Sequence, residues 1–297
     1  MNNIEFYKMS GSGNDFILID NRHNQIGACL RPAFAKTICQ RAMSVGADGL
    51  IIIEKSTVAD FKWHFLNTDG SEADMCGNGA RCAARFAYLI GLAGLEMTFE
   101  TNAGLIRAEM DGEQVKIQMT DPSDISMDET INLFDRVESI PCMNTGVPHA
   151  VVVVSDVNTV AIESMGPLIR YHKQYTPGGI NANFIQQCDK KTVAIRTYER
   201  GVEAETLACG TGAVAGAITA SRVFGFKSPV RVMTRSGLTL EVSFTKKVKG
   251  FKNVFLKGDA RVIYRARLEK DALLMMDDME NPSSNKMMSQ QSAPIAT

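Results

Sequence analysis

Two cysteines in this chain of 297 residues stand in the same local sequence. Cys76 begins Cys-Gly-Asn-Gly and Cys209 begins Cys-Gly-Thr-Gly, and each glycine turn leads into a run of small residues. Backbone N–H groups at a helix start favour anions, so we expect these turns to bind a carboxylate and to lower the pKa of both thiols. Two thiols on opposite sides of one carbon could remove a proton from one face and replace it on the other.

For a single Cys-Gly-x-Gly, a buried cysteine before a tight turn would be the simpler interpretation. The repetition changes this, because the two cysteines are 133 residues apart and other residues recur, in order, at the same offset. The recurring pairs include Gly13 and Gly146, Gly46 and Gly179, Asp48 and Asn181, and Gly104 and Gly237. We therefore predict a duplicated domain whose pseudo-twofold axis brings the cysteines together.

The pattern within each half favours strands around one buried helix. We expect helices over 31–43, 80–90 and 213–224, and the last is so rich in Ala, Gly and Thr that strands must cover it. The predicted fold class is α+β, with two pseudo-symmetric domains, each a strand-rich, barrel-like sheet around a central helix. The expected domains are 1–121 plus 258–268, carrying Cys76, and 122–257, carrying Cys209.

Composition narrows the class of protein further. The formal net charge of −1 gives no footprint for nucleic acid or an anionic membrane, and no apolar run is long enough to span a bilayer. Seven cysteines without a CxxC pattern favour reduced thiols and no metal site. No signal peptide is apparent, so we expect a cytoplasmic protein. The segment 269–297 is polar and aperiodic, which predicts a disordered tail.

Polar residues precede both turns or stand at strand entrances. Glu199 and Arg200 end a strand shortly before Cys209, and Asn67 stands at the comparable place before Cys76. An arginine fork can hold a carboxylate, and a glutamate can hold an ammonium group. His149 follows a proline at a strand entrance, where a structural role and a site role are equally compatible with the sequence.

These motifs together resemble the diaminopimelate epimerase family over about residues 4–264. The matching segments are Lys8-Met9-Ser10-Gly11-Ser12-Gly13-Asn14-Asp15-Phe16, Asn67-x-Asp69-Gly70-Ser71-Glu72 with Met75-Cys76-Gly77-Asn78-Gly79-Ala80-Arg81-Cys82, Gly146-x-Pro148-His149, and Tyr198-Glu199-Arg200-Gly201 with Glu205-Thr206-Leu207-Ala208-Cys209-Gly210-Thr211-Gly212. The resemblance implies a cofactor-independent homodimer that binds an amino acid between two domains. It also implies interconversion of LL- and meso-diaminopimelate, a step toward lysine and peptidoglycan.

The resemblance assigns roles to individual residues. Cys76 and Cys209 would be the two catalytic bases. The α-carboxylate would be bound by Gly77, Asn78, Gly210 and Thr211. Substrate contacts would come from Asn14, Asn67, Asn181, Glu199 and Arg200, and His149 with Glu199 would support the reacting end.

One position departs from the family pattern. Many members have Asn where this chain has Val147, a side chain that cannot hydrogen-bond. A racemase of the same fold acting on glutamate, proline or hydroxyproline therefore stays open. So does a non-enzymatic binding or thiol-redox protein in which the two cysteines pair. A pyridoxal-phosphate enzyme is less compatible, because no lysine stands in a setting typical of a Schiff base.

Overall fold

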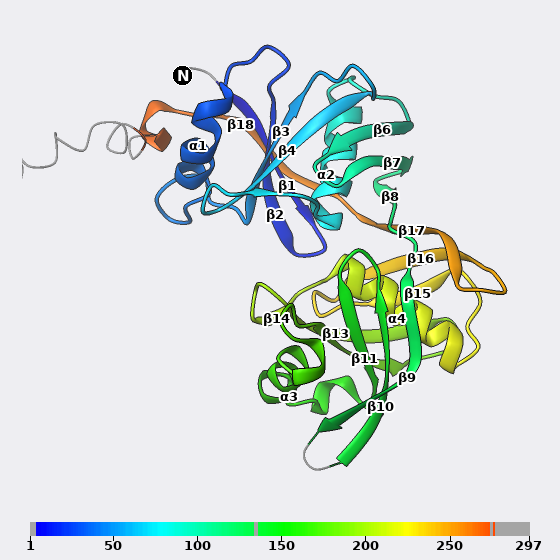
Figure 1. Ribbon diagram of the computed structural model, residues 1–297. Helices are drawn as coiled ribbons and strands as arrows, with labels where there is room; N and C mark the ends of the chain where they lie inside the picture. The colour runs from blue at the N-terminus through cyan, green and yellow to red at the C-terminus, as the bar shows by residue number, and fades with distance from the viewer. Residues whose placement is uncertain (1–3, 134–135, 274–275, 277–297) are drawn as a thin grey trace, which may run out of the picture.

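The computed structural model describes residues 4–133, 136–273 and 276, which form two lobes (Figure 1). The first lobe contains β1 (Glu5–Gly11), β2 (Asn14–Asp20), β3 (Gly49–Glu54), β4 (Phe61–Asn67), β5 (Glu72–Ala73), β6 (Glu96–Thr101), β7 (Gly104–Asp111), β8 (Gln114–Gln118) and β18 (Arg261–Arg267), with helices α1 (Arg31–Ile38) and α2 (Gly77–Leu89). The second contains β9 (Ser123–Leu133), β10 (Arg136–Asn144), β11 (Pro148–Val153), β12 (Asn181–Gln187), β13 (Thr192–Glu199), β14 (Ala204–Thr206), β15 (Val230–Met233), β16 (Thr239–Lys246) and β17 (Phe251–Asp259), with α3 (Ile162–Arg170) and α4 (Gly210–Val223). Short 3-10 helices are η1 (Ala28–Leu30), η2 (Val157–Thr159), η3 (Lys173–Tyr175) and η4 (Lys270–Leu273).

The strand pairing repeats between the lobes. β1 and β2 are antiparallel, β2 and β3 parallel, and β3 and β4 antiparallel, and the same sequence of pairings runs through β10, β11, β12 and β13. The lobes join where β8 pairs with β17. The chain crosses the junction twice: β9, which follows β8, pairs with β10, and β18, which follows β17, pairs with β1. The predicted α+β fold of two similar domains is confirmed.

Helices α2 and α4 lie within the two lobes, packed among strands. Alanines on both helices, including Ala83 and Ala217, are completely buried. Small residues let the sheets come close: a Cβ at Gly216 would lie 3.2 Å from side chains of both Ile185 and Ile195. Each helix begins three residues earlier than the sequence predicted, because the glycines after each cysteine form its first turn.

Helix α1 is shorter than the predicted 31–43. It ends at Ile38, and Ala42 (φ 66°) and Gly46 (φ 75°) take left-handed conformations that a helix cannot include. Helix α3 was not among the predicted helices, and its interior contains Pro167. In the part of the chain that the structure describes, no helix is long and apolar enough to cross a membrane.

The C-terminal segment differs from the expected disorder at its beginning. η4 packs beside α1, where Leu273 and Met276 are buried, and Ser44 Oγ donates to the Ala272 carbonyl at 2.8 Å. The apolar side chains at the start of this segment, Leu273 and Met276, pack into the cluster beside α1 and order it. The remainder of the predicted tail, 274–275 and 277–297, lies outside the described residues.

The number of residues that separates equivalent positions in the two halves is not constant but changes by one between neighbouring strands. Phe16 pairs with Gly49 and His149 pairs with Asn181, so the first members differ by 133 and the second by 132. Strands β4 and β13 keep the offset of 132, and the cysteines return to 133. Asn181 therefore occupies the place of Gly49 rather than of Asp48, and Glu199 occupies the place of Asn67.

Candidate active site

The starts of α2 and α4 meet at the junction of the two lobes. A Cβ at Gly210 would lie 3.9 Å from the Cα of Gly77, and both glycines face the same methyl group of Leu256 on β17. Cys76 and Cys209 are the N-cap residues of these helices, with extended backbones that end each incoming loop. The structure thus brings the two predicted cysteines to one place.

Both thiols accept hydrogen bonds from their helix starts. Cys76 Sγ accepts from Gly79 N and Cys209 Sγ accepts from Gly212 N, each at 3.4 Å. Thr211 Oγ1 lies 3.4 Å from Cys209 Sγ. These contacts favour thiolates, as the sequence predicted.

Burial outweighs these contacts and raises the pKa of both thiols. For Cys209 burial, followed by the nearby Glu199 charge, raises the pKa to about 12. For Cys76 burial again dominates, and the hydrogen bonds from Gly79 and Asn78 offset it only in part. The prediction that the helix ends lower both pKa values was therefore wrong. Removing a thiolate from water destabilises it more than the hydrogen bonds from the first helix turn stabilise it.

In the first lobe two of the predicted residues contact each other directly. Asn78 Nδ2 donates to Asn14 Oδ1 at 2.6 Å, and Asn14 Nδ2 donates to Asp48 Oδ2 at 3.2 Å. Asp48 in turn accepts from Arg41 at 2.8 Å. This chain of contacts fixes which way both amides point beside the start of α2.

Sequence reasoning missed Arg81, which completes this arrangement. Its Nη2 donates to Asn78 Oδ1 and to Ser12 Oγ, both at 2.8 Å, and its side chain is completely buried. The signal was available, since a charged residue among small ones on a helix expected to be buried calls for a reason.

In the second lobe Glu199 lies beside Cys209. Glu199 Oε2 accepts from Thr206 Oγ1 at 2.9 Å, and burial raises the pKa of this carboxyl despite hydrogen bonds from Thr206 and Cys209. The backbone carbonyl of Thr211 accepts from Thr145 Oγ1 at 3.0 Å. The Cys209 side thus contains an acidic group where the Cys76 side contains amides.

Asn181 connects two of the predicted positions. Its Oδ1 accepts from Arg200 N at 2.8 Å and its Nδ2 donates to the Pro148 carbonyl at 2.9 Å. Among the described residues, the Arg200 guanidinium has only long contacts, at 3.4 and 3.5 Å, with the carbonyls of Gly178 and Gly179. Arg200 can therefore still engage a carboxylate.

His149 is completely buried, and Asn183 Nδ2 donates to its Nδ1 at 3.0 Å. The proton of the neutral ring therefore lies on Nε2, which has no hydrogen-bond partner among the described residues. Burial lowers the pKa of His149 to about 3, so the ring is neutral at physiological pH. Asn183, which sequence reasoning missed, sets the ring's tautomer.

Asn67 is less directly connected to the others. Its Nδ2 donates to Ser71 Oγ at 3.0 Å within its own turn, and among the described residues no hydrogen bond joins it to either cysteine turn. Val147 is half-buried and its carbonyl accepts from Thr145 N at 3.1 Å. Of these two positions only Val147 departs from the family pattern, because its side chain cannot hydrogen-bond.

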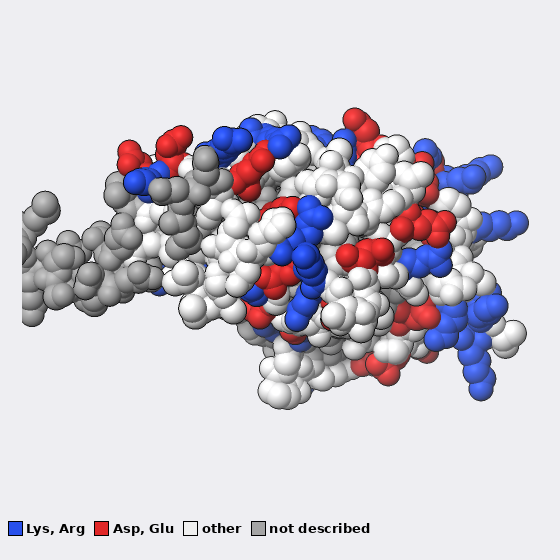
Figure 2. Space-filling view, turned by 90° about the horizontal axis from the view of Figure 1, so that it is seen from above, with Lys and Arg blue, Asp and Glu red and all other residues white. Residues whose placement is uncertain are grey.

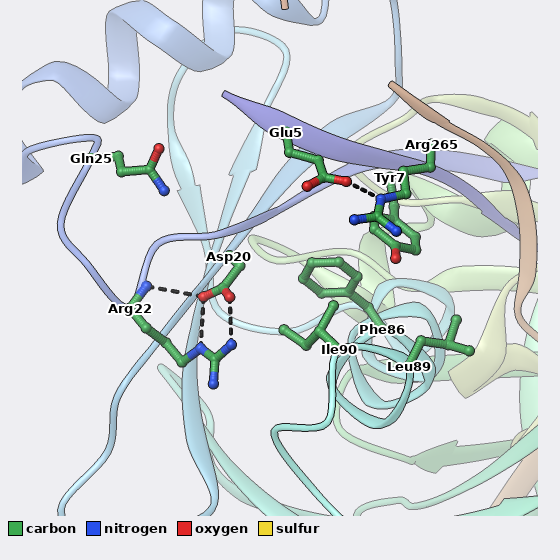
Figure 3. Close-up of a pocket in the computed structure, with 9 residues that line it drawn as sticks. All are labelled: Glu5, Tyr7, Asp20, Arg22, Gln25, Phe86, Leu89, Ile90 and Arg265. Carbon is green, nitrogen blue, oxygen red and sulfur yellow. Dashed lines mark hydrogen bonds and ion pairs between the residues drawn. The ribbon is translucent and has the colours of Figure 1, made fainter. Parts of the chain in front are cut away.

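Two other surface features lie apart from the cysteines. Figure 2 shows positive and negative side chains mixed over one face of the molecule, without a patch of one sign. Figure 3 shows a groove between β1, β18 and the C-terminal end of α2, containing the ion pairs Glu5–Arg265 and Asp20–Arg22. Within the described ranges no cluster of three or more His, Cys, Asp or Glu is arranged to hold a metal ion.

Solved structures with low sequence identity share this fold. The chain aligns with a phenazine biosynthesis protein of the PhzF family from Bacillus anthracis at a TM-score of 0.70 and 18% identity, covering 91% of this chain and 100% of that one. A hydroxyproline epimerase from Agrobacterium vitis aligns at 0.65 and 14% identity, covering 91% and 94%. The fold therefore belongs to a class that includes amino-acid epimerases.

Sequence relatives identify the family within this class. The diaminopimelate epimerase family model matches residues 6–125 and 142–263. A diaminopimelate epimerase from Aquifex aeolicus is 46% identical over 283 residues, covering 91% of this chain and 99% of that protein. The chain belongs to the diaminopimelate epimerase family, and the resemblance seen in its motifs is confirmed.

Proposed function

We propose that this protein is a cofactor-independent isomerase that interconverts LL- and meso-diaminopimelate by inverting one α-carbon. The observation that carries the proposal is the meeting of two cysteine-capped helix starts, with Gly77 and Gly210 in near contact. A site with two thiols and two sets of helix-start N–H groups has what a two-base proton transfer needs.

In the proposed reaction the backbone N–H groups of Gly77–Asn78 and of Gly210–Thr211 bind the α-carboxylate. One cysteine, as its thiolate, removes the α-proton, and the thiol of the other delivers a proton to the opposite face. Negative charge spreads onto the carboxylate while the carbon is deprotonated. The two helix starts stabilise this charge. In other enzymes, removing one such preorganised donor costs roughly 3–4 kcal/mol of transition-state stabilisation.

The raised thiol pKa values fit this chemistry. An α C–H bond next to a carboxylate is a very weak acid, so a strong base is needed to remove its proton. A thiolate whose pKa lies far above that of a free cysteine is such a base once it forms. The ammonium group of a bound amino acid would bring a positive charge to the thiols and favour the ionised form.

The remaining polar residues would hold the rest of the substrate. Arg200 is suited to a carboxylate at the far end, and Asn14, Asn67 and Asn181 would bind the distal amino and carboxyl groups. Glu199 and the neutral His149 would support the reacting end. With Val147 in place of a polar residue, recognition of the distal amino group would fall to these asparagines.

The organisation of the whole protein forms part of the proposal. The two domains would be 1–121 plus 258–268 and 122–257, closing on the substrate and excluding water. The protein would act as a homodimer in the cytoplasm, in the biosynthesis of lysine, with no requirement for nucleic acid or a membrane.

The test is solvent deuterium exchange at the α-carbon, under reducing conditions, across LL- and meso-diaminopimelate, glutamate, proline and hydroxyproline. The proposal predicts exchange with diaminopimelate at a kcat/KM about a hundred-fold above the others, because proline and hydroxyproline lack a distal carboxylate for Arg200 and glutamate lacks the distal amino group that the asparagines would bind. Preference for a cyclic amino acid or glutamate would support the rival racemases. Exchange with none would support a binding or thiol-redox protein.

A further inference from the structure

Arg81 stands out because its charge is completely buried without a carboxylate partner. The residue is 0% exposed, and it forms no ion pair among the described residues, where Asp259 pairs with Arg261 instead. Its hydrogen bonds go to neutral acceptors: Nε to the Asp259 carbonyl at 3.1 Å, Nη1 to the Gly77 carbonyl at 3.3 Å, and Nη2 to Ser12 Oγ and Asn78 Oδ1 at 2.8 Å. A buried cation is costly, so a side chain of this kind needs a function to explain it.

The nearest carboxylate is engaged elsewhere. Asp259 Oδ1 accepts from the backbone N and the Oγ of Ser12, at 3.0 and 2.9 Å, and Asp259 Oδ2 accepts from Arg261 at 3.0 Å. Arg81 therefore meets only the backbone of Asp259. Gly258 makes room for it, because a Cβ there would lie 3.0 Å from Arg81 Nε.

The contacts of Arg81 converge on one amide. Because the guanidinium can only donate, Asn78 must present its Oδ1 to Arg81, and its Nδ2 then points to Asn14 Oδ1. The same guanidinium holds the Gly77 carbonyl, which belongs to the peptide that presents Asn78 N at the helix start. Lysine could not reproduce this fork.

The second lobe shows that the fold does not need this residue. Val214 stands 133 residues after Arg81, on α4, and is completely buried in apolar surroundings. Thr145, the counterpart of Ser12, donates directly to the Thr211 carbonyl of its helix start. One lobe thus anchors its helix start with a hydroxyl alone, while the other inserts a charged fork.

We propose that Arg81 is a positioning residue for the epimerisation, acting through Asn78. It sets the Asn78 amide and the first turn of α2 in the orientation that binds the α-carboxylate as charge develops on it. This inference rests on the proposed function, since it concerns the same carboxylate.

The same helix offers a matched control. Arg85, one turn later, also donates to backbone carbonyls, those of Ala260 at 2.8 Å and Glu113 at 3.3 Å, but in the described part of the chain it forms no hydrogen bond or ion pair with a predicted site residue. Arg81→Lys and Arg85→Lys would be compared in the full-length protein for thermal unfolding, kcat and KM with diaminopimelate. Arg81→Lys should lower kcat about 10- to 100-fold with KM within about threefold, and Arg85→Lys should change neither beyond about threefold.

A double-mutant cycle tests the route through Asn78. In an Asn78→Ala background the further change Arg81→Lys should cost less than about threefold in kcat, because the residue that it positions is gone. Equal kcat losses for the two lysine variants, or an undiminished Arg81→Lys effect without Asn78, would overturn the inference and leave the proposed function standing. If Arg81→Lys fails to fold, Ser12→Ala takes its place in the same cycle, because it removes the hydroxyl that accepts a hydrogen bond from Arg81 Nη2. Wild-type protein that exchanges no amino acid would overturn both.

Discussion

The Cys76 half and the Cys209 half share a backbone plan but surround their thiols with different chemistry. Beside Cys76 lie the Asn78 amide and the buried Arg81 cation, whereas beside Cys209 lie the Glu199 carboxyl and the Thr211 hydroxyl. The difference teaches that duplication supplies the two opposed helix starts, whereas divergence of the neighbouring side chains makes the surroundings of the two thiols unlike.

The loops that lead into the two cysteines are also held by different contacts, which we call the loop tethers: the hydrogen bonds of Glu72 and of Glu205. Glu72 and Glu205 each stand four residues before a cysteine. Glu205 accepts two hydrogen bonds from Arg196, at 2.6 and 2.7 Å, whereas Glu72 accepts one from His64 Nδ1 at 2.8 Å. His64 and Arg196 are counterparts at the strand offset of 132. One loop is therefore held by a permanent charged fork and the other by a single imidazole contact.

The largest expected effect is loss of either thiol. Cys76→Ser and Cys209→Ser should each lower the rate of epimerisation by about a thousand-fold or more, because each removes one of two required proton carriers. Activity and circular dichroism would be measured together, with the exposed Cys188→Ser as control. A variant of either site cysteine with near-wild-type epimerisation contradicts the two-thiol mechanism.

Next come the loop tethers. Glu205→Gln should destabilise the protein by about 2–3 kcal/mol, because it leaves Arg196, whose side chain is only 12% exposed, without its charged partner. Glu72→Gln should cost less than about 1 kcal/mol, since the Glu72 side chain is 44% exposed and that of Glu205 15%.

Urea unfolding at neutral pH measures both changes. The comparison between the halves breaks down if the two glutamine variants lose equal free energy of unfolding.

A smaller difference is expected at the second glycine of each turn. A Cβ at Gly212 would lie 2.6 Å from Asn183 Oδ1, which accepts from Thr197, so this site has no room without moving a buried hydrogen-bond network. A Cβ at Gly79 would meet the flexible end of Ile51 at 3.2 Å. Gly212→Ala should therefore cost about 1–3 kcal/mol in unfolding free energy, and Gly79→Ala less than about 1 kcal/mol. Equal melting temperatures for the two variants would contradict this difference, because they would show that both turns accommodate a Cβ equally well.

The smallest effect is a pH dependence. Burial raises the pKa of Cys209 from 9.0 to about 12, so the stability linked to this thiol is complete below pH 9 and is lost as the pH rises from 9 toward 12. Relative to Cys209→Ser, the wild type should lose up to about 1.4 kcal/mol of unfolding free energy between pH 9 and 10. Glu199→Gln should move the thiolate absorbance change of Cys209 to lower pH, because it removes a nearby negative charge. A difference that stays constant with pH would contradict the raised pKa.

Much of this arrangement could be predicted from the sequence because it depends on local rules. Cys-Gly-x-Gly predicts a helix start, and its repetition predicts that a pseudo-twofold axis relates the two helix starts. The contact of Asn14 with Asn78 also follows the prediction that both belong to one site. The role that each residue plays there remains a prediction.

Other features depend on balances that a sequence does not display. Whether helix-start hydrogen bonds or burial decides the pKa of Cys209 depends on how deeply the lobes enclose it. The offset between the halves changes from 133 to 132 in the connection between β2 and β3, or between β11 and β12, and Glu199 therefore aligns with Asn67. The length of such a connection leaves the hydrophobic pattern of the strands unchanged, so the sequence pattern does not reveal it. Arg81 was overlooked because a charged residue on a helix usually faces water, although its place among small residues on a helix expected to be buried was a signal, and the structure shows that its side chain is 0% exposed.

The central claim is that two thiols serve opposite faces of one carbon, and early-time conversion in deuterated water tests it most directly. Starting from protiated LL-diaminopimelate, the account predicts that the first meso product carries deuterium at the inverted carbon while the remaining substrate stays protiated. Meso product that keeps the original proton, or equal deuterium in substrate and product from the first turnovers, would point to a single base and contradict the account.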